Sequence, residues 1–365
     1  MKVLKFGGSS VGSSKRISKV VEILDRYSRK GNAICVVSAV GGITDKLLYA
    51  GQLALEKDEK YITEFEAIKT IHLSIVSDLL PDDNAVVLTY LDEELSYLKN
   101  LLDGIFLINE LTPKTSDKLT SFGELLSSFI IAEVAKQKGI DAVRKNSQDL
   151  IITNSNFTKA EVDFDSTNKN ITTYFKQASQ LTILPGFVSK SKHGEVTTLG
   201  RGGSDFTASI LASALQVNQL EIWTDVSGMF TANPKLVKQA VPIQELSYQE
   251  AMELSHFGAK VLFPPTVQPA LDADIPILIK NTLRPDDKGT LIKTTTNTSA
   301  GSVRGISGVD DIALLTLEGN GMVGIPGFSK RLFEVLASEK INVIFITQAS
   351  SEHSICFGIS EADAD

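Results

Sequence analysis

The chain has 365 residues, of which 36 are basic and 44 acidic, giving a formal charge of −8 at pH 7. This length suits two domains, and 42% hydrophobic with 22% charged residues is the composition of a folded globular protein. The net negative charge argues against a general role in binding nucleic acid or an anionic membrane. No apolar run approaches the ~20 residues of a membrane span, which favours a cytoplasmic protein with no membrane partner.

The first part of the chain alternates strand and helix patterns. Residues 2–6 predict a short strand, a Gly/Ser turn and an amphipathic helix follow, and the apolar run at 33–40 predicts a buried strand. This βαβ opening indicates a parallel sheet. Residues 44–139 are almost entirely helical in pattern, and the later elements predicted are strands at 181–188, 196–199, 220–224 and 275–280, with a helix at 205–215. The alternation predicts one layered α/β domain over residues 1–293.

A second unit follows residues 294–301 (TTTNTSAG), which are small, polar and non-periodic and therefore predict a linker. Over residues 302–365 the pattern predicts β-α-β-β, with strands at 312–317, 343–347 and 354–359 and a helix at 328–338. A ferredoxin-like unit needs another helix and strand. We therefore expect this domain to be incomplete, or to be completed by other chain.

The segment KFGGSSVG, Lys5 to Gly12, joins the first strand to the first helix. Consecutive glycines there let backbone N–H groups approach a phosphate at a helix N-terminus, where the helix dipole favours anions. The cation beside this turn is Lys5. A Gly-rich turn is also common as a purely structural feature, so this segment alone leaves both interpretations open.

A second strand-to-helix junction, TLGRGGSDFTA at 198–208, carries Arg201 and Asp205. The planar guanidinium of Arg201 suits a carboxylate, and Asp205 could accept from a substrate ammonium or serve only as a first-turn helix carboxylate.

Two further segments follow in the chain. The segment WTDVSGMFTANPK at 223–235 follows a strand end, where ligands bind in open α/β sheets. FGAKVLFPPT at 257–266 carries Lys260, although a lone lysine is usually solvated surface.

Taken together and in this order, the four segments resemble the aspartokinase family within the amino acid kinase superfamily. SAVGGIT at 38–44 and SFGELLS at 121–127 match further family positions. The resemblance implies a three-layer αβα amino acid kinase fold (carbamate kinase-like), with ATP and aspartate across the C-terminal edge of the sheet. It implies Lys5, Lys260 and Asp205 as catalytic residues.

The resemblance also assigns binding residues by motif. For the nucleotide it implies Lys5, Gly7, Gly8, Thr224, Asp225, Phe230, Lys235, Lys260 and Val261. For the substrate it implies Ser38, Thr44, Glu124, Arg201 and Asp205. Phe230 and Lys235 stand where other members often carry Tyr and Arg, so ring and charge are kept.

Residues 303–327 and 342–355 resemble the first ACT regulatory repeat of threonine-sensitive aspartokinases fused to homoserine dehydrogenase. This implies an incomplete C-terminal ACT domain, feedback control, a homo-oligomer formed through ACT domains, and a chain that could be the N-terminal part of a longer enzyme. Lysine-inhibited relatives carry an acidic residue where this chain has Ile344. The resemblance therefore favours threonine as effector, with Gln348 as its partner.

The implied reaction is transfer of the γ-phosphoryl group of ATP, bound with Mg²⁺, to the β-carboxylate of L-aspartate. The product, 4-phospho-L-aspartate, begins the pathway to lysine, threonine and methionine. The histidines show no ligand spacing, which predicts no protein-only metal site. Alternatives are an amino acid kinase with another acceptor (glutamate, acetylglutamate or a nucleotide monophosphate) and a catalytically silent effector-binding module. A dinucleotide-dependent dehydrogenase is disfavoured because no GxGxxG follows the first strand.

Overall fold

The computed structural model describes residues 1–29, 31, 33–82, 84–256, 262–296, 303–319, 322, 325–348 and 353–364. The chain divides into two compact units, residues 1–306 and 307–365. The division falls after Ile306, and residues 297–301 of the predicted linker lie outside the described part. Ile306 itself is tied to the first unit, because its N–H donates to the carbonyl of Thr231 at 2.8 Å.

An eight-stranded sheet forms the centre of the first unit. Its strand order is β3 (Ala142–Arg144), β5 (Leu181–Pro185), β2 (Ala33–Val37), β1 (Lys2–Phe6), β8 (Gln219–Thr224), β10 (Ile277–Asn281), β11 (Thr290–Lys293) and β9 (Glu245–Ser247). Neighbouring strands from β3 to β10 pair in parallel, and β11 is antiparallel to β10. The carboxyl ends of six strands therefore meet at one edge, where open α/β sheets bind ligands.

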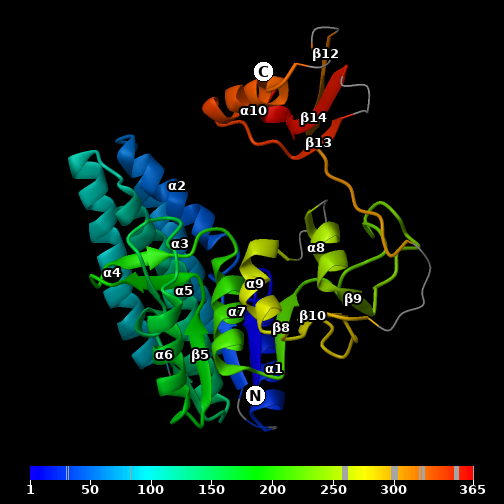
Figure 1. The fold of residues 1–365 in the computed structure, drawn as a ribbon. Helices are drawn as coiled ribbons and strands as arrows, with labels where there is room; N and C mark the ends of the chain where they lie inside the picture. The colour runs from blue at the N-terminus through cyan, green and yellow to red at the C-terminus, as the bar shows by residue number, and fades with distance from the viewer. Residues whose placement is uncertain are drawn as a thin grey trace. The chain divides into compact units, whose positions relative to one another are not determined.

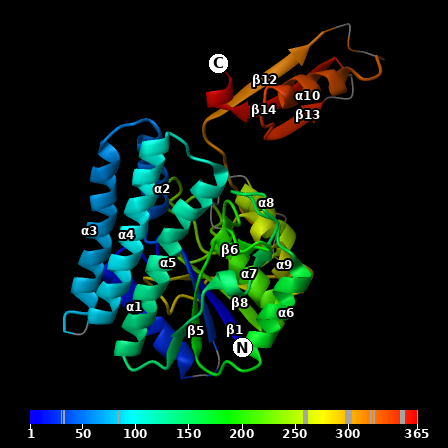
Figure 2. The same ribbon diagram turned by 90° about the vertical axis from the view of Figure 1, so that its left-hand side faces the viewer.

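Helices cover both faces of this sheet (Figures 1 and 2). One layer holds α1 (Ser14–Ser28), α2 (Ile43–Leu55), α3 (Lys60–Leu79), α4 (Ala85–Ile108) and α5 (Pro113–Gln137), and the other holds α6 (Phe164–Phe175), α7 (Gly203–Leu215), α8 (Tyr248–His256) and α9 (Pro264–Asp272). Alternating side chains of β1 supply the two cores, with Leu4 and Phe6 packed in the first and Val3 in the second. The predicted three-layer αβα architecture is confirmed.

Two predicted strands differ from the observed ones by more than two residues at one end. The run at 181–188 is divided, because Phe187 has a left-handed backbone (φ 64°) that turns the chain out of the main sheet. β5 stays in that sheet, whereas the next strand, β6 (Val188–Ser191), joins β4 (Ile152–Thr153) and β7 (Val196–Thr198) in a small separate sheet. The predicted strand at 33–40 ends at Val37, although Ala39 and Val40 remain buried in the loop beyond it.

The second unit contains β12 (Ile312–Glu318), α10 (Phe328–Ser338), β13 (Phe345–Gln348), β14 (Ser354–Ser360) and a 3₁₀ turn, Glu361–Asp363. This is the predicted β-α-β-β order. The antiparallel sheet has the order β12-β14-β13, and α10 packs on one face against Ile355, Phe357 and Ile359. Edge strand β12 leaves Leu314 and Leu315 exposed by 62% and 38%. Part of this apolar sheet is therefore uncovered among the described residues.

Candidate active site

The Gly/Ser turn after β1 is held against the end of β8. The N–H of Gly7 donates to the carbonyl of Trp223 at 3.2 Å, and the Ser10 hydroxyl donates to the same carbonyl at 3.1 Å. Helix α1 then begins with Ser13 as N-cap, its hydroxyl accepting from the Arg16 N–H at 3.4 Å. The predicted phosphate turn thus lies at the carboxyl edge of the sheet, with its helix N-terminus fixed.

Lys5 and Asp205 form an ion pair at this edge. Lys5 Nζ lies 2.6 Å from Asp205 Oδ1, and the two side chains are only 11% and 14% exposed. Lys5 lies in β1, and Asp205 lies in the first turn of α7. The residue predicted to meet phosphate and the residue predicted to meet the acceptor are therefore in direct contact.

A cavity of about 530 Å³ opens beside this pair. Five of the predicted site residues line it: Lys5, Thr44, Glu124, Arg201 and Asp205. They come from β1, α2, α5, the turn after β7, and α7, so the fold gathers residues separated by up to 200 positions. The predicted Ser38 is not among the lining residues, but its carbonyl accepts from the Ser127 hydroxyl of α5 at 2.7 Å.

Glu124 is a buried carboxyl group in this cavity, only 4% exposed. Helix α5 comes close enough to place it there because position 123 is glycine, where a Cβ would lie 2.7 Å from the Ala39 side chain. Burial raises the pKa of Glu124 to about 8, against opposing backbone hydrogen bonds and the charge of Lys5. Its Oε2 makes no hydrogen bond to any described residue. Glu124 Oε2 is therefore free to accept a hydrogen bond from a cationic ligand in the cavity.

Arg201 projects from a turn with glycine on both sides. Gly200 and Gly202 have φ values of +73° and +74°, a left-handed conformation that favours glycine. The Arg201 guanidinium lies 5.4 Å from the centre of the Phe263 ring, and the residue is exposed although it lines the cavity. An exposed positive group and largely buried acidic groups in one cavity match the charges of an amino acid.

The predicted nucleotide residues from Thr224 to Lys235 lie at the end of β8 and in the loop that follows it. The Thr224 hydroxyl donates to Asp225 Oδ1 at 3.2 Å, and the Asn281 amide donates to the Asp225 carbonyl at 3.3 Å. Phe230 forms an isolated β-bridge with Pro242, and Lys235 is exposed. Lys260 and Val261 lie outside the described residues.

Several residues of the cavity were not predicted from the sequence: Asp117, Thr120, Thr158, Phe187, Thr198 and Ser204. Asp117 carried a usable signal, since it precedes Glu124 by seven residues, two turns of one helix, and so shares its face. Thr198 and Ser204 lie within the motif at 198–208, which marked their segment. Phe187 carried no signal, because its left-handed turn is not visible in the strand pattern.

In the second unit, Gln348 lines a separate cavity of about 330 Å³ together with Met322, Phe328, Ser329 and Ile355.

Among the residues described, no group of three or more His, Cys, Asp or Glu side chains is arranged to hold a metal ion. No described helix is long and apolar enough to cross a membrane.

Comparison with known proteins assigns the family. Residues 1–281 match the amino acid kinase family, and residues 315–365 match an ACT domain. The fold, the cavity and these matches together define an amino acid kinase with a C-terminal ACT domain.

Individual relatives narrow this class. The chain is 36% identical over 378 residues to bifunctional aspartokinase/homoserine dehydrogenase 2, chloroplastic, of Arabidopsis thaliana, covering 100% of this chain and 40% of that protein. The structure of E. coli aspartokinase III with aspartate and ADP has a TM-score of 0.82 and 30% identity, over 99% of this chain and 78% of that one. The same enzyme with lysine and aspartate has a TM-score of 0.83 and 29% identity, over 99% and 79%. The chain belongs to the aspartokinases, and it spans about 40% of the length of the plant bifunctional relatives.

Proposed function

We propose that this chain transfers the γ-phosphoryl group of ATP to the β-carboxylate of L-aspartate, giving 4-phospho-L-aspartate. The observation that carries the proposal is the convergence of Lys5, Glu124, Arg201 and Asp205 on one cavity next to the Gly/Ser turn. A solved relative has been crystallised with aspartate and ADP. The reaction would be the first step toward lysine, threonine and methionine, in a cytoplasmic setting.

The charges of the cavity complement those of aspartate. Arg201 would hold one carboxylate through paired hydrogen bonds, while Glu124 and Asp205 would accept from the ammonium. Burial raises the pKa of Glu124. The positive charge of a bound ammonium would favour the ionised form of this carboxyl group. Thr44 in the lining, and Ser38 beside it, would add hydroxyl contacts. The remaining carboxylate then points toward Lys5 and the phosphate turn.

Catalysis would depend on alignment and charge. The β-carboxylate of aspartate is ionised at neutral pH, so the acceptor needs no general base. Holding both reactants in line lowers the barrier by up to roughly 7–11 kcal/mol. Lys5 and Lys260 would offset negative charge that spreads over the transferring phosphoryl oxygens.

The residues present fit a nucleotide at the turn after β1. A Cβ on Gly8 would lie 3.3 Å from the Ala39 carbonyl, so glycine keeps this backbone compact and free of side chains. Gly7, Gly8 and Lys5 would hold phosphates, with Thr224, Asp225, Phe230, Lys235, Lys260 and Val261 around the rest. Mg²⁺ would arrive on the phosphates, where it supplies positive charge, because protein sites rarely enclose it alone.

One experiment distinguishes this proposal from two alternative functions. A kinase for glutamate, acetylglutamate or a nucleotide monophosphate would use the same edge of the sheet with a different acceptor. A silent effector-binding module would retain the fold without turnover. A coupled assay of ADP release should show activity with aspartate and little with the other acceptors, whereas no ADP release with any acceptor would favour the silent module.

Replacing Arg201 with alanine is expected to raise the aspartate KM far more than the ATP KM. Loss of a charge-assisted paired contact reduces binding by on the order of 1.5–3 kcal/mol, which corresponds to about 10-fold to 150-fold. Steady-state kinetics with each substrate varied in turn measures both constants. An aspartate KM equal to that of the unchanged protein would remove Arg201 from the acceptor site.

We propose threonine as the effector of the ACT region, held near the cavity that Gln348 lines. The Gln348 amide can donate to and accept from a threonine hydroxyl. Ile344 offers no charge to a lysine ammonium, and burying that group unpaired would be unfavourable by several kcal/mol. Calorimetric titration of the full-length enzyme should detect threonine and not lysine, and Gln348→Ala should weaken threonine binding. Lysine binding as tight as threonine binding, or no effect of Gln348→Ala, would reject this effector.

We also propose that the protein self-associates through its ACT region. Leu314, Leu315 and Leu317 of edge strand β12 are exposed by 37–62%, and a strand edge with apolar side chains tends to pair with another chain. Light scattering should find an oligomer that dissociates when the chain is cut after Ile306. A monomer at every concentration tested would contradict the proposal.

A further inference from the structure

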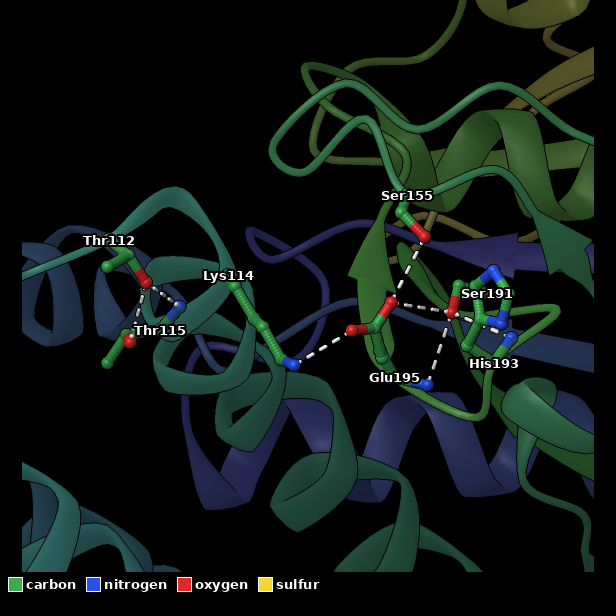
Figure 3. A network of polar contacts seen from close by, with 7 residues as sticks. All are labelled: Thr112, Lys114, Thr115, Ser155, Ser191, His193 and Glu195. Atoms are coloured by element: carbon green, nitrogen blue, oxygen red, sulfur yellow. Dashed lines mark hydrogen bonds and ion pairs between the residues drawn. The ribbon is translucent and has the colours of Figure 1, made fainter.

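The start of α5 is joined to the β6–β7 hairpin by polar contacts (Figure 3). Thr112 caps the helix, its hydroxyl accepting from the Thr115 N–H at 3.1 Å. Lys114 Nζ lies 2.8 Å from Glu195 Oε1 in the hairpin. Glu195 also accepts from the hydroxyls of Ser155 and Ser191, each at 3.0 Å. The bond from Lys114, followed by those from the two serines, lowers the pKa of Glu195 to about 2. This exposed ion pair links the start of α5 to the hairpin but adds little to its stability.

One turn further along α5, Asp117 makes a second, buried set of contacts. Asp117 is 1% exposed, although it lines the cavity of about 530 Å³ that Lys5, Glu124 and Arg201 also line. Oδ2 accepts from the backbone N–H groups of Thr158 at 2.9 Å and Thr198 at 3.1 Å, and Oδ1 accepts from the Thr198 hydroxyl. Both oxygens are engaged by the protein. Asp117 is thus poorly suited to bind the acceptor itself.

These bonds support the turn that carries Arg201. Thr198 is the last residue of β7, three positions before Arg201, and its carbonyl accepts from the Ala160 N–H at 3.1 Å. The Thr158 carbonyl packs against Gly200, where a Cβ would lie 3.2 Å away. Because glycines flank Arg201, the turn has little stiffness of its own. Its direction depends on the Thr158 and Thr198 segments, and both are held by Asp117.

We propose that Asp117 is a positioning residue for the acceptor site: through Thr158 and Thr198 it fixes the turn from which Arg201 holds the substrate carboxylate. The proposal rests on the proposed function, since it takes aspartate as the ligand of Arg201. It predicts a larger effect on aspartate binding than on nucleotide binding, because the side-chain bonds of Asp117 go to Thr158 and Thr198 and to none of the described nucleotide residues at β1 and β8.

The test compares Asp117→Ala, Asp117→Asn and Lys114→Ala in the full chain. Alanine leaves two buried N–H groups unpaired and is expected to raise the aspartate KM about 10-fold to 100-fold, with the ATP KM changed less than about 2-fold. Asparagine should restore most of the affinity, because its amide oxygen can accept both N–H bonds and its NH₂ can donate to the Thr198 hydroxyl. Lys114→Ala is the matched control, since it removes an exposed contact to the same hairpin and should change neither KM.

Thr198→Val provides a test that does not depend on the folding of Asp117→Ala. It removes only the hydroxyl bond and should raise the aspartate KM by about 3-fold to 10-fold, without changing the ATP KM. Equal changes in both KM values, or an unchanged aspartate KM in both Asp117→Ala and Thr198→Val, would overturn the proposal. Failure of the unchanged protein to phosphorylate aspartate would instead reject the proposed function, so the two failures are distinguishable.

Discussion

Replacing Lys5 with methionine is expected to lower kcat about 10²-fold to 10³-fold at saturating ATP and aspartate, the usual effect of removing one group that stabilises developing charge. Lys5 Nζ lies at the cavity, 2.6 Å from Asp205, and its side chain is 11% exposed. Methionine keeps the packing of the apolar stem within β1 and removes only the charge. Coupled measurement of ADP release gives kcat, and circular dichroism confirms that the variant is folded.

Lys46→Met is the control for this prediction. Lys46 lies on α2, where its Nζ is 3.0 Å from Glu64 and its side chain is 38% exposed, and it does not line the cavity. Its replacement should leave kcat unchanged. Near-normal turnover in Lys5→Met would make Lys5 a structural partner of Asp205, and the same assay on Lys260→Ala tests the second predicted catalytic lysine.

Replacing Glu221 with alanine is expected to lower the free energy of unfolding of the first unit by about 3–5 kcal/mol. Glu221 is fully buried in β8, where its carboxylate meets Lys2 Nζ at 2.7 Å, the Tyr27 hydroxyl at 2.7 Å and the indole N–H of Trp223 at 3.1 Å. Burial and the Glu221 carboxylate raise the pKa of Tyr27, so its hydroxyl remains a donor. Alanine would leave the buried Trp223 N–H and the partly buried Tyr27 hydroxyl unpaired and would leave a cavity behind.

Urea unfolding followed by tryptophan fluorescence measures this effect within the first unit, because Trp223 is the only tryptophan in the chain. Glu245→Ala is the matched control, since Glu245 lies in β9 of the same sheet and its ion pair to Lys293, at 3.0 Å, is about one-third exposed. Its loss should change stability by less than about 1 kcal/mol. A shift in Glu221→Ala no greater than in Glu245→Ala would show that the buried network adds little.

The sequence predicted the strand at 2–6 and the helix at 328–338 at their observed bounds, because apolar spacing and flanking glycines mark them clearly. Strands β3, β4, β9 and β11 have two to four residues and were missed, since so few residues show no periodicity. The break at Phe187 was missed because a left-handed backbone at a bulky residue is set by tertiary contacts.

The candidate site was predicted where motifs mark it and missed where only the fold creates it. Thr44, Glu124, Arg201 and Asp205 were found through their motifs, and the structure brings them together with Lys5 around one cavity. The direct pairing of Lys5 with Asp205 depends on β1 and α7 meeting in space, which no local pattern encodes. The hydrogen bonds of Asp117 likewise join segments 41 and 81 residues away along the chain.

The central place of β1 has a consequence for synthesis on the ribosome. Within this chain the partner strand β2 follows β1 within about 30 residues, yet its other partner β8 begins only at Gln219. Until then one edge of β1 has no native neighbour, and such edges bind other extended chains. The nascent polypeptide thus carries an open strand edge until β8 has been synthesised. Chaperone protection of that interval would determine how much newly made protein reaches the native state.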